Sequence, residues 1–183
     1  GNIMIEIRWH GRGGQGAFTA ARLIGEAASI HEGKYAQAFP SFGPERRGAP
    51  VLSFTRISEE PIYDHSELET CDYVVVLDDT LYGPNVYSGI KENGVLIINT
   101  RKDASEFKDS GVKVITIDAT VISLDIIRMD ITNVPMAGVL AAVTNIVNLD
   151  SINKAIDTQL GPKIREKNKK LLLEAYNCAK GGN

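Results

Sequence analysis

Cysteine is scarce in this chain, since Cys71 and Cys178 are the only two among 183 residues. They lie far apart, so the sequence contains neither a disulfide framework nor a C-x-x-C metal or redox motif. An iron-sulfur cluster is usually held by four thiolates, and structural zinc by four Cys or His ligands at local spacings. We therefore expect that this chain binds no metal or cluster of its own and works in a reducing cytoplasm.

Basic charge and long apolar runs are also lacking. The formal net charge is -3, without the basic excess that nucleic-acid binding requires. The longest apolar stretch, residues 136–149, contains polar residues and is shorter than the roughly 20 residues of a membrane span. The opening GNIMIEIRWH is typical of a strand rather than of a secretion signal. We expect no nucleic-acid partner and no membrane partner.

The apolar pattern predicts strands that alternate with helices. This order favours an α/β fold, a three-layer α/β/α sandwich around a mainly parallel sheet, as one domain over residues 1–183 with a helical C-terminal part. The strand at 51–57 follows its predecessor closely, which allows part of the sheet to be antiparallel. The expected strands are 3–9, 34–39, 51–57, 72–79, 94–100 and 112–118; the expected helices are 17–31, 80–93, 101–110, 119–129, 136–148, 151–159 and 163–180.

A glycine-rich loop, HGRGGQGA, joins the first strand to the first helix. Gly11, Gly13 and Gly16 fit the dinucleotide pattern G-x-G-x-x-G. However, no carboxylate follows the second strand to hold a ribose, and the Lys-Ser/Thr of a phosphate-binding P-loop is missing. Two interpretations stay open. Amides at the helix N-terminus, with Gly14, Arg12 and Gln15, can bind an anion, or the glycines can simply permit a tight turn and close packing.

A second loop, FPSFGPERRGAP at residues 39–50, is made rigid by its prolines and carries Gly43 and Gly48. Arg46 and Arg47 suit a phosphate or carboxylate, and Glu45 can orient one of them. The alternative is a solvated turn with weak surface ion pairs. If the first two strands are adjacent and parallel, both loops emerge at the same carboxyl edge, where open α/β sheets bind ligands. That predicts a shared anion-binding or docking surface.

The remaining candidates for chemistry are weaker. Asp78 and Asp79 allow a magnesium site, although a helix N-cap at Asp79 or Thr80 is the interpretation we favour. His10 lies beside the glycine loop, and we favour a structural, hydrogen-bonded histidine over one that acts on a ligand. No catalytic triad, paired-carboxylate site or metal cage is recognisable, so we assign no catalytic or metal-binding residue and expect the isolated chain to be inactive.

Several segments in order along residues 4–175 match one family. Together they resemble the gamma subunit, or gamma domain, of 2-oxoacid:ferredoxin oxidoreductases, and the pairing of the glycine loop with A-F-P-x-F-G-x-E-R-R-G-A-P is the specific feature. The segments are EIRWHGRGGQGAFTAARLIGEAA, GKYAQAFPSFGPERRGAPVLSFTRI, CDYVVVLDDTL, ENGVLIINT and NVPMAGVLAAVTNIV.

The resemblance implies a subunit of an oxidoreductase that decarboxylates a 2-oxoacid on thiamine diphosphate with Mg, reduces ferredoxin through iron-sulfur clusters and releases an acyl-CoA. Those cofactors belong to companion subunits of alpha, beta and delta type. This chain is expected to contribute to coenzyme A handling and assembly, through Gly11, Arg12, Gly13, Gly14, Gln15, Gly16, Gly43, Glu45, Arg46, Arg47 and Gly48.

The forms H-G-R-G-G-Q-G and A-Q-A-F-P resemble pyruvate or branched-chain enzymes more than 2-oxoglutarate ones. Two alternative functions stay open at this point. One is a self-sufficient NAD(P)-binding oxidoreductase built on the glycine loop, and the other is a purely structural assembly subunit.

Overall fold

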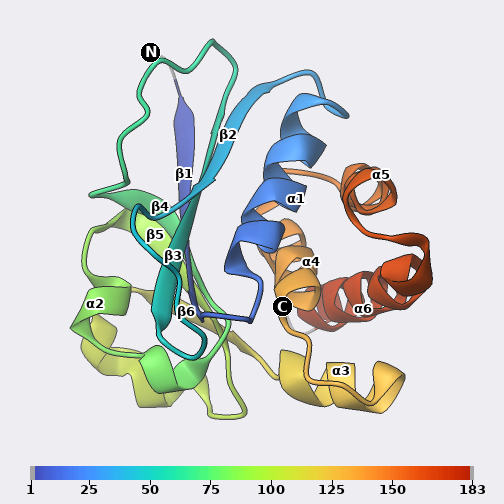
Figure 1. The fold of residues 1–183 in the computed structure, drawn as a ribbon. Coiled ribbons are helices and arrows are strands. Elements are labelled where there is room, and N and C mark those ends of the chain that lie inside the picture. The colour runs from blue at the N-terminus through green and yellow to red at the C-terminus, as the bar shows by residue number, and fades with distance from the viewer. Residues whose placement is uncertain (1–2, 182–183) are drawn as a thin grey trace.

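A single six-stranded sheet forms the centre of the computed structural model, which describes residues 3–181 (Figure 1). The strand order is β2-β3-β1-β4-β5-β6. The strands are β1 (Met4–Arg12), β2 (Tyr35–Pro40), β3 (Pro50–Ser58), β4 (Cys71–Val76), β5 (Ile90–Asn99) and β6 (Lys113–Ile117). The centres of the runs at 72–79 and 94–100 are continuously apolar because β4 and β5 are inner strands, covered on both faces.

The sheet is mixed, and only β3 runs against the others. β1, β4, β5 and β6 pair in parallel, whereas β3 is antiparallel to both β1 and β2. The expected adjacency of the first two strands is wrong, because β3 lies between them. The connection at 41–49 is shorter than the dozen or more residues that a parallel crossover needs, so it closes a hairpin instead. β1 and β2 nevertheless point the same way, since each opposes β3.

The helices of one face form a thick layer over the larger apolar core (Figure 1). This layer contains α1 (Ala17–Ser29), α4 (Asn133–Thr144), α5 (Leu149–Gln159) and α6 (Pro162–Gly181), with α3 (Ala119–Ile127) at the end of the sheet. The α4 sequence NVPMAGVLAAVT is apolar on nearly every side, which is typical of a fully buried helix. It begins earlier than expected and ends at Asn145, whose φ is 56°.

The opposite face carries only a thin layer. It consists of 3-10 helices at Asp79–Leu81 and Ala104–Ser110 and the single turn α2 (Pro84–Tyr87), over a small cluster that includes Phe54, Leu96 and Phe107. The three-layer fold is therefore confirmed, with layers of unequal depth.

Full helical crossovers at 80–93 and 101–110 are wrong expectations. Gly83 and Pro84 interrupt the first, Gly89 has a φ of 80°, and residues 90–93 belong to β5. The second is a 3-10 helix that Gly111 ends with a φ of 72°.

No helix within residues 3–181 is both long enough and apolar enough to cross a membrane.

A substitution at Gly138 tests how closely α4 and α6 pack in the thick helical layer. A Cβ there would lie 2.7 Å from the backbone oxygen of Leu172 on α6, whereas a Cβ on Gly25 of α1 would meet its nearest neighbour at 3.4 Å. We expect Gly138→Ala to lower the free energy of unfolding by about 1–3 kcal/mol, because α4 and α6 must move apart. The matched Gly25→Ala should be neutral or stabilising by up to about 1 kcal/mol, from helix propensity. Urea denaturation of both variants measures this, and equal effects would contradict the proposed close contact.

Candidate functional site at the carboxyl edge of the sheet

The two loops meet at the carboxyl edge of β1 and β2. The Gly13 amide donates to the Ala49 carbonyl at 2.8 Å, and the Gly48 amide donates to the Gly13 carbonyl at 3.0 Å. A Cβ on Gly13 would lie 2.0 Å from the backbone oxygen of Arg46. What comes close to the glycine loop is therefore the second loop of the same chain.

Gly16 permits a second close approach. Its φ is 79°, and an added Cβ would lie 2.4 Å from Asn133 Nδ2 at the start of α4. Among residues 3–181, the amides of Gly14 and Gly16 have no hydrogen-bond partner, and both lie just before α1. The packing interpretation thus accounts for Gly13 and Gly16, while two amides at the helix N-terminus stay available to a ligand.

Arg12 and Gln15 use their side chains to hold the two loops in place. Arg12 donates to the Gly48 carbonyl at 3.0 Å and to Thr80 Oγ1 at 3.1 Å, and its Nε lies 3.5 Å from Asp78 Oδ2. Gln15 Oε1 accepts from the Arg12 amide at 2.7 Å, and Gln15 Nε2 donates to Asp78 Oδ2 at 2.9 Å. Burial by itself would raise the pKa of Asp78, but bonds from Thr80 and Gln15 and the Arg12 charge outweigh it and lower that pKa.

The two arginines of the second loop lie at the surface. Arg46 and Arg47 are exposed, and neither makes an ion pair with any residue in the described range 3–181. Glu45 is also exposed and pairs with neither arginine within that range, so its expected orienting role is not seen. The Phe42 amide donates to Glu67 Oε1 at 2.8 Å, which holds the loop from its other side.

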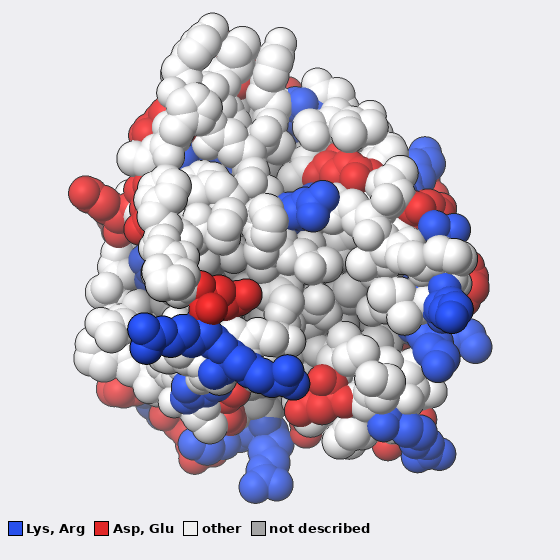
Figure 2. Space-filling view, viewed as in Figure 1, with Lys and Arg blue, Asp and Glu red and all other residues white. Residues whose placement is uncertain are grey.

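Basic side chains gather over the end of the sheet where the β2–β3 connection lies, and acidic groups lie beside them (Figure 2). Gly43 and Gly48 have φ values of 113° and 80°, so both support the loop's turns rather than a ligand contact of their own. The second loop thus carries two guanidinium groups that make no ion pair within residues 3–181.

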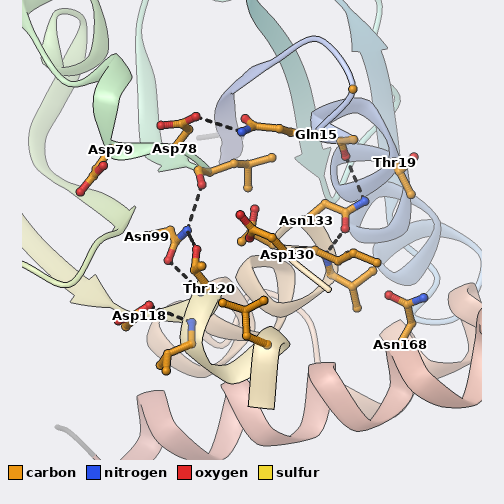
Figure 3. A pocket seen from close by; sticks show the side chains of 18 of the residues that line it. Gln15, Thr19, Asp78, Asp79, Asn99, Asp118, Thr120, Asp130, Asn133 and Asn168 are labelled. Carbon is orange, nitrogen blue, oxygen red and sulfur yellow. Dashed lines mark hydrogen bonds between the residues drawn. The ribbon is translucent and has the colours of Figure 1, made fainter. Parts of the chain in front are cut away.

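A pocket of about 780 Å³ opens beside the glycine loop (Figure 3). Gly14, Gln15 and Gly16 line one side of it, and residues 43–48 lie outside it. The other walls come from the residues after β4, β5 and β6 and from α3, α4 and α6. The two predicted loops thus share an edge, but only the glycine loop reaches the pocket.

The charged lining of the pocket is mainly acidic, and sequence reasoning missed most of the polar lining. Asn99 ends β5 and bonds the Ala119 amide at 2.8 Å, which joins the sheet to α3. The sequence signal that could have located this lining is the set of polar residues that directly follow β4, β5 and β6. The acidic and amide side chains in the lining are Asp78, Asp79, Asn99, Asp118, Asp130, Asn133 and Asn168, with Gln15 and the single cation Arg101.

The capping assignment after β4 is off by one residue. Asp78, rather than Asp79 or Thr80, is the N-cap, and its Oδ1 accepts from the Thr80 amide at 3.0 Å. Asp79 Oδ2 instead accepts from Thr100 Oγ1 at 2.6 Å. Within residues 3–181, no three His, Cys, Asp or Glu residues are grouped so that they could hold a metal ion.

His10 is a structural residue beneath the glycine loop. It is 6% exposed, and its Nε2 accepts from Arg8 Nε at 2.8 Å. Burial and the nearby Arg8 charge lower the pKa of His10 to about 3. The ring is therefore neutral and already hydrogen-bonded, which confirms the structural interpretation.

These features define an α/β protein with a mainly parallel sheet, a polar pocket and two exposed arginines at the carboxyl edge of that sheet. The chain belongs to the pyruvate ferredoxin/flavodoxin oxidoreductase family, whose model matches residues 6–178. It is a gamma-type subunit of a 2-oxoacid:ferredoxin oxidoreductase, as the resemblance implied. This assignment replaces the self-sufficient NAD(P)-dependent alternative.

Similar proteins support this assignment along the whole chain. Pyruvate synthase subunit PorC of Methanocaldococcus jannaschii is 50% identical, over 95% of this chain and 96% of the relative. The pyruvate/ketoisovalerate oxidoreductases common subunit gamma of Thermococcus litoralis is 47% identical, over 94% and 96%. The crystal structure of pyruvate oxidoreductase subunit PORC from Thermotoga maritima has a TM-score of 0.83 at 42% identity, over 95% and 96%.

Gly13→Ala tests the contact between the loops. The added methyl group would collide with the Arg46 carbonyl, so we expect the second loop to detach and trypsin to cut after Arg46 or Arg47 several-fold faster. Gly11→Ala is the control, because its nearest neighbour is the flexible end of Leu77 at 3.3 Å. Timed proteolysis followed by mass spectrometry measures the rates, and unchanged cleavage in Gly13→Ala would refute the contact.

His10 predicts a pH dependence of stability. The unfolded chain protonates this ring below pH 6.5, whereas the folded chain keeps it neutral down to about 3, so its contribution is present above pH 6.5 and lost on acidification. Between pH 7 and pH 5 the loss should be about 2 kcal/mol. Urea denaturation at both pH values should show that His10→Gln, which keeps an acceptor for Arg8, removes this part of the slope. An unchanged slope would mean that the ring titrates normally.

Proposed function

We propose that this subunit contacts the phosphate groups of coenzyme A through Arg46 and Arg47 and serves a pyruvate or branched-chain 2-oxoacid enzyme of the cytoplasm. The observation that carries the proposal is the pair of exposed, unpaired guanidinium groups that the glycine loop holds at the carboxyl edge. Guanidinium forks suit phosphate oxygens. The names of the relatives support the oxoacid assignment.

The pocket constrains where those phosphates can lie. Four aspartates line it; Arg12 pairs with Asp78, and Arg101 is the single cation in the lining for the other three, so a polyanion would be repelled from its interior. Phosphates therefore belong on the outer side of the glycine loop, toward Arg46 and Arg47. Arg12 supports them indirectly, because its guanidinium holds the Gly48 carbonyl in place.

The redox cofactors fit companion subunits rather than this chain. Cys71 is buried and Cys178 is exposed, and two separated thiols cannot supply the four ligands of a cluster. When bound in the assembled enzyme, thiamine diphosphate with Mg supplies decarboxylation, and the clusters carry electrons to ferredoxin. The alpha, beta and delta-type subunits would hold them, while this chain orients coenzyme A.

Calorimetry on the assembled enzyme tests the role of Arg47. We expect Arg47→Ala to weaken coenzyme A binding about tenfold or more, because a charge-assisted hydrogen bond is lost. Lys113→Ala is the control, since Lys113 is an exposed cation at the start of β6, at the opposite edge of the sheet. Equal affinities in the wild type and Arg47→Ala would remove this arginine from the proposed site.

A purely structural role remains the second candidate, and the inward bonds of Arg12 and Gln15 favour it. In that case Arg46 and Arg47 contact a companion subunit. Arg47→Ala would then release this chain from the complex without changing coenzyme A affinity in the complexes that remain. Native mass spectrometry of the calorimetry samples distinguishes the two functions.

A further inference from the structure

The pocket contains hydrogen-bond acceptors that nothing in the described chain uses. Asn168, on α6, is only 5% exposed; its Nδ2 donates to the Ile164 carbonyl at 2.9 Å, but its Oδ1 has no partner within residues 3–181. In Figure 3 this amide lies at the pocket wall with its oxygen toward the other labelled residues. Asp130, at the mouth, likewise has no ion pair or hydrogen bond in that range. The buried Asn168 oxygen requires a donor from outside the described chain, whereas the exposed Asp130 carboxylate is free to pair with a cation from a partner.

The charge of the pocket specifies what kind of donor fits. Arg12 already neutralises Asp78, so Asp79, Asp118 and Asp130 face Arg101 as the single remaining cation in the lining. Unused acceptors together with excess negative charge favour a cationic, donor-rich group, such as a lysine or arginine side chain. The same charge excludes phosphate.

An apolar rim lies directly beside these acids. Val121 and Leu124 on α3 and Ile164 on α6 line the pocket and are 45%, 42% and 48% exposed. Met129, one residue before Asp130, is 54% exposed. A group of exposed apolar side chains around a charged pocket is typical of an interface rather than of free surface. The rim fits a segment in which a basic residue has apolar neighbours.

We infer that this pocket and its α3–α6 rim are the docking site for a companion subunit of the oxidoreductase, which inserts a lysine or arginine side chain. Charge complementarity identifies the occupant, and membership in a multi-subunit enzyme supplies the companion. The inference rests on the subunit assignment and not on coenzyme A handling. The arginines proposed for coenzyme A lie outside this pocket, so the two surfaces can be tested separately.

Charge reversal at the mouth of the pocket tests the inference in the assembled enzyme. We expect Asp130→Lys to make this chain dissociate from the complex at lower salt, with an affinity at least tenfold weaker, because two cations would then oppose each other. Asp125→Lys is the matched control: it makes the same charge change at an exposed position on α3 that does not line the pocket. Native mass spectrometry across a salt series measures the retained subunit. Equal retention in Asp130→Lys and wild type would overturn the inference.

Crosslinking identifies the occupant directly. A photo-crosslinker on Val121→Cys, in a Cys178→Ser background, should attach to a companion subunit at a peptide that contains lysine or arginine. Attachment to a second copy of this chain, or no attachment, would overturn the inference. A small-molecule site in this pocket would also overturn the inference. In that case coenzyme A would protect position 121 from crosslinking, and the Asp130→Lys enzyme would assemble normally but bind coenzyme A more weakly.

Discussion

The contact between the Gly13 backbone and residues 46–49 is the constraint on which the rest of this edge depends. Two backbone hydrogen bonds join the loops, and no side chain larger than hydrogen fits between Gly13 and the Arg46 carbonyl. Arg12 and Gln15 then tie the joined loops to Asp78 at the end of β4. Their polar side chains, which sequence alone would offer to a ligand, are largely used for support.

That support separates two electrostatic environments within one edge of the sheet. Outside the glycine loop, Arg46 and Arg47 face solvent without partners; inside it, aspartates line a pocket with Arg101 as the only cation in its described lining. Like charges at short range cost free energy, especially where water is partly excluded. One edge can therefore receive an anionic ligand and a cationic protein segment at neighbouring positions without mixing them.

Sequence patterns predicted the features that depend on residues close together in the chain. The apolar runs located all six strands, and the glycine loop was correctly placed between a strand and a helix. The crossover at 80–93 failed because its helical spacing competes with Gly83, Pro84 and Gly89, whose backbone geometry breaks the helix. Asp130 and Asn168 were missed because they come from segments that approach the glycine loop only after folding.

By itself, then, the sequence determined the alternating elements, the two unusual loops, the pairing of their motifs that resembles one family, and the absence of enough thiols for a cluster. These follow from residue type and short spacing. Tertiary structure alone decided that β3 lies between β1 and β2, that the loops bond to each other, and that the pocket is acidic. Such features depend on which distant segments of the chain come into contact. Hydrogen bonding and steric exclusion between those segments are not visible in a short stretch of sequence.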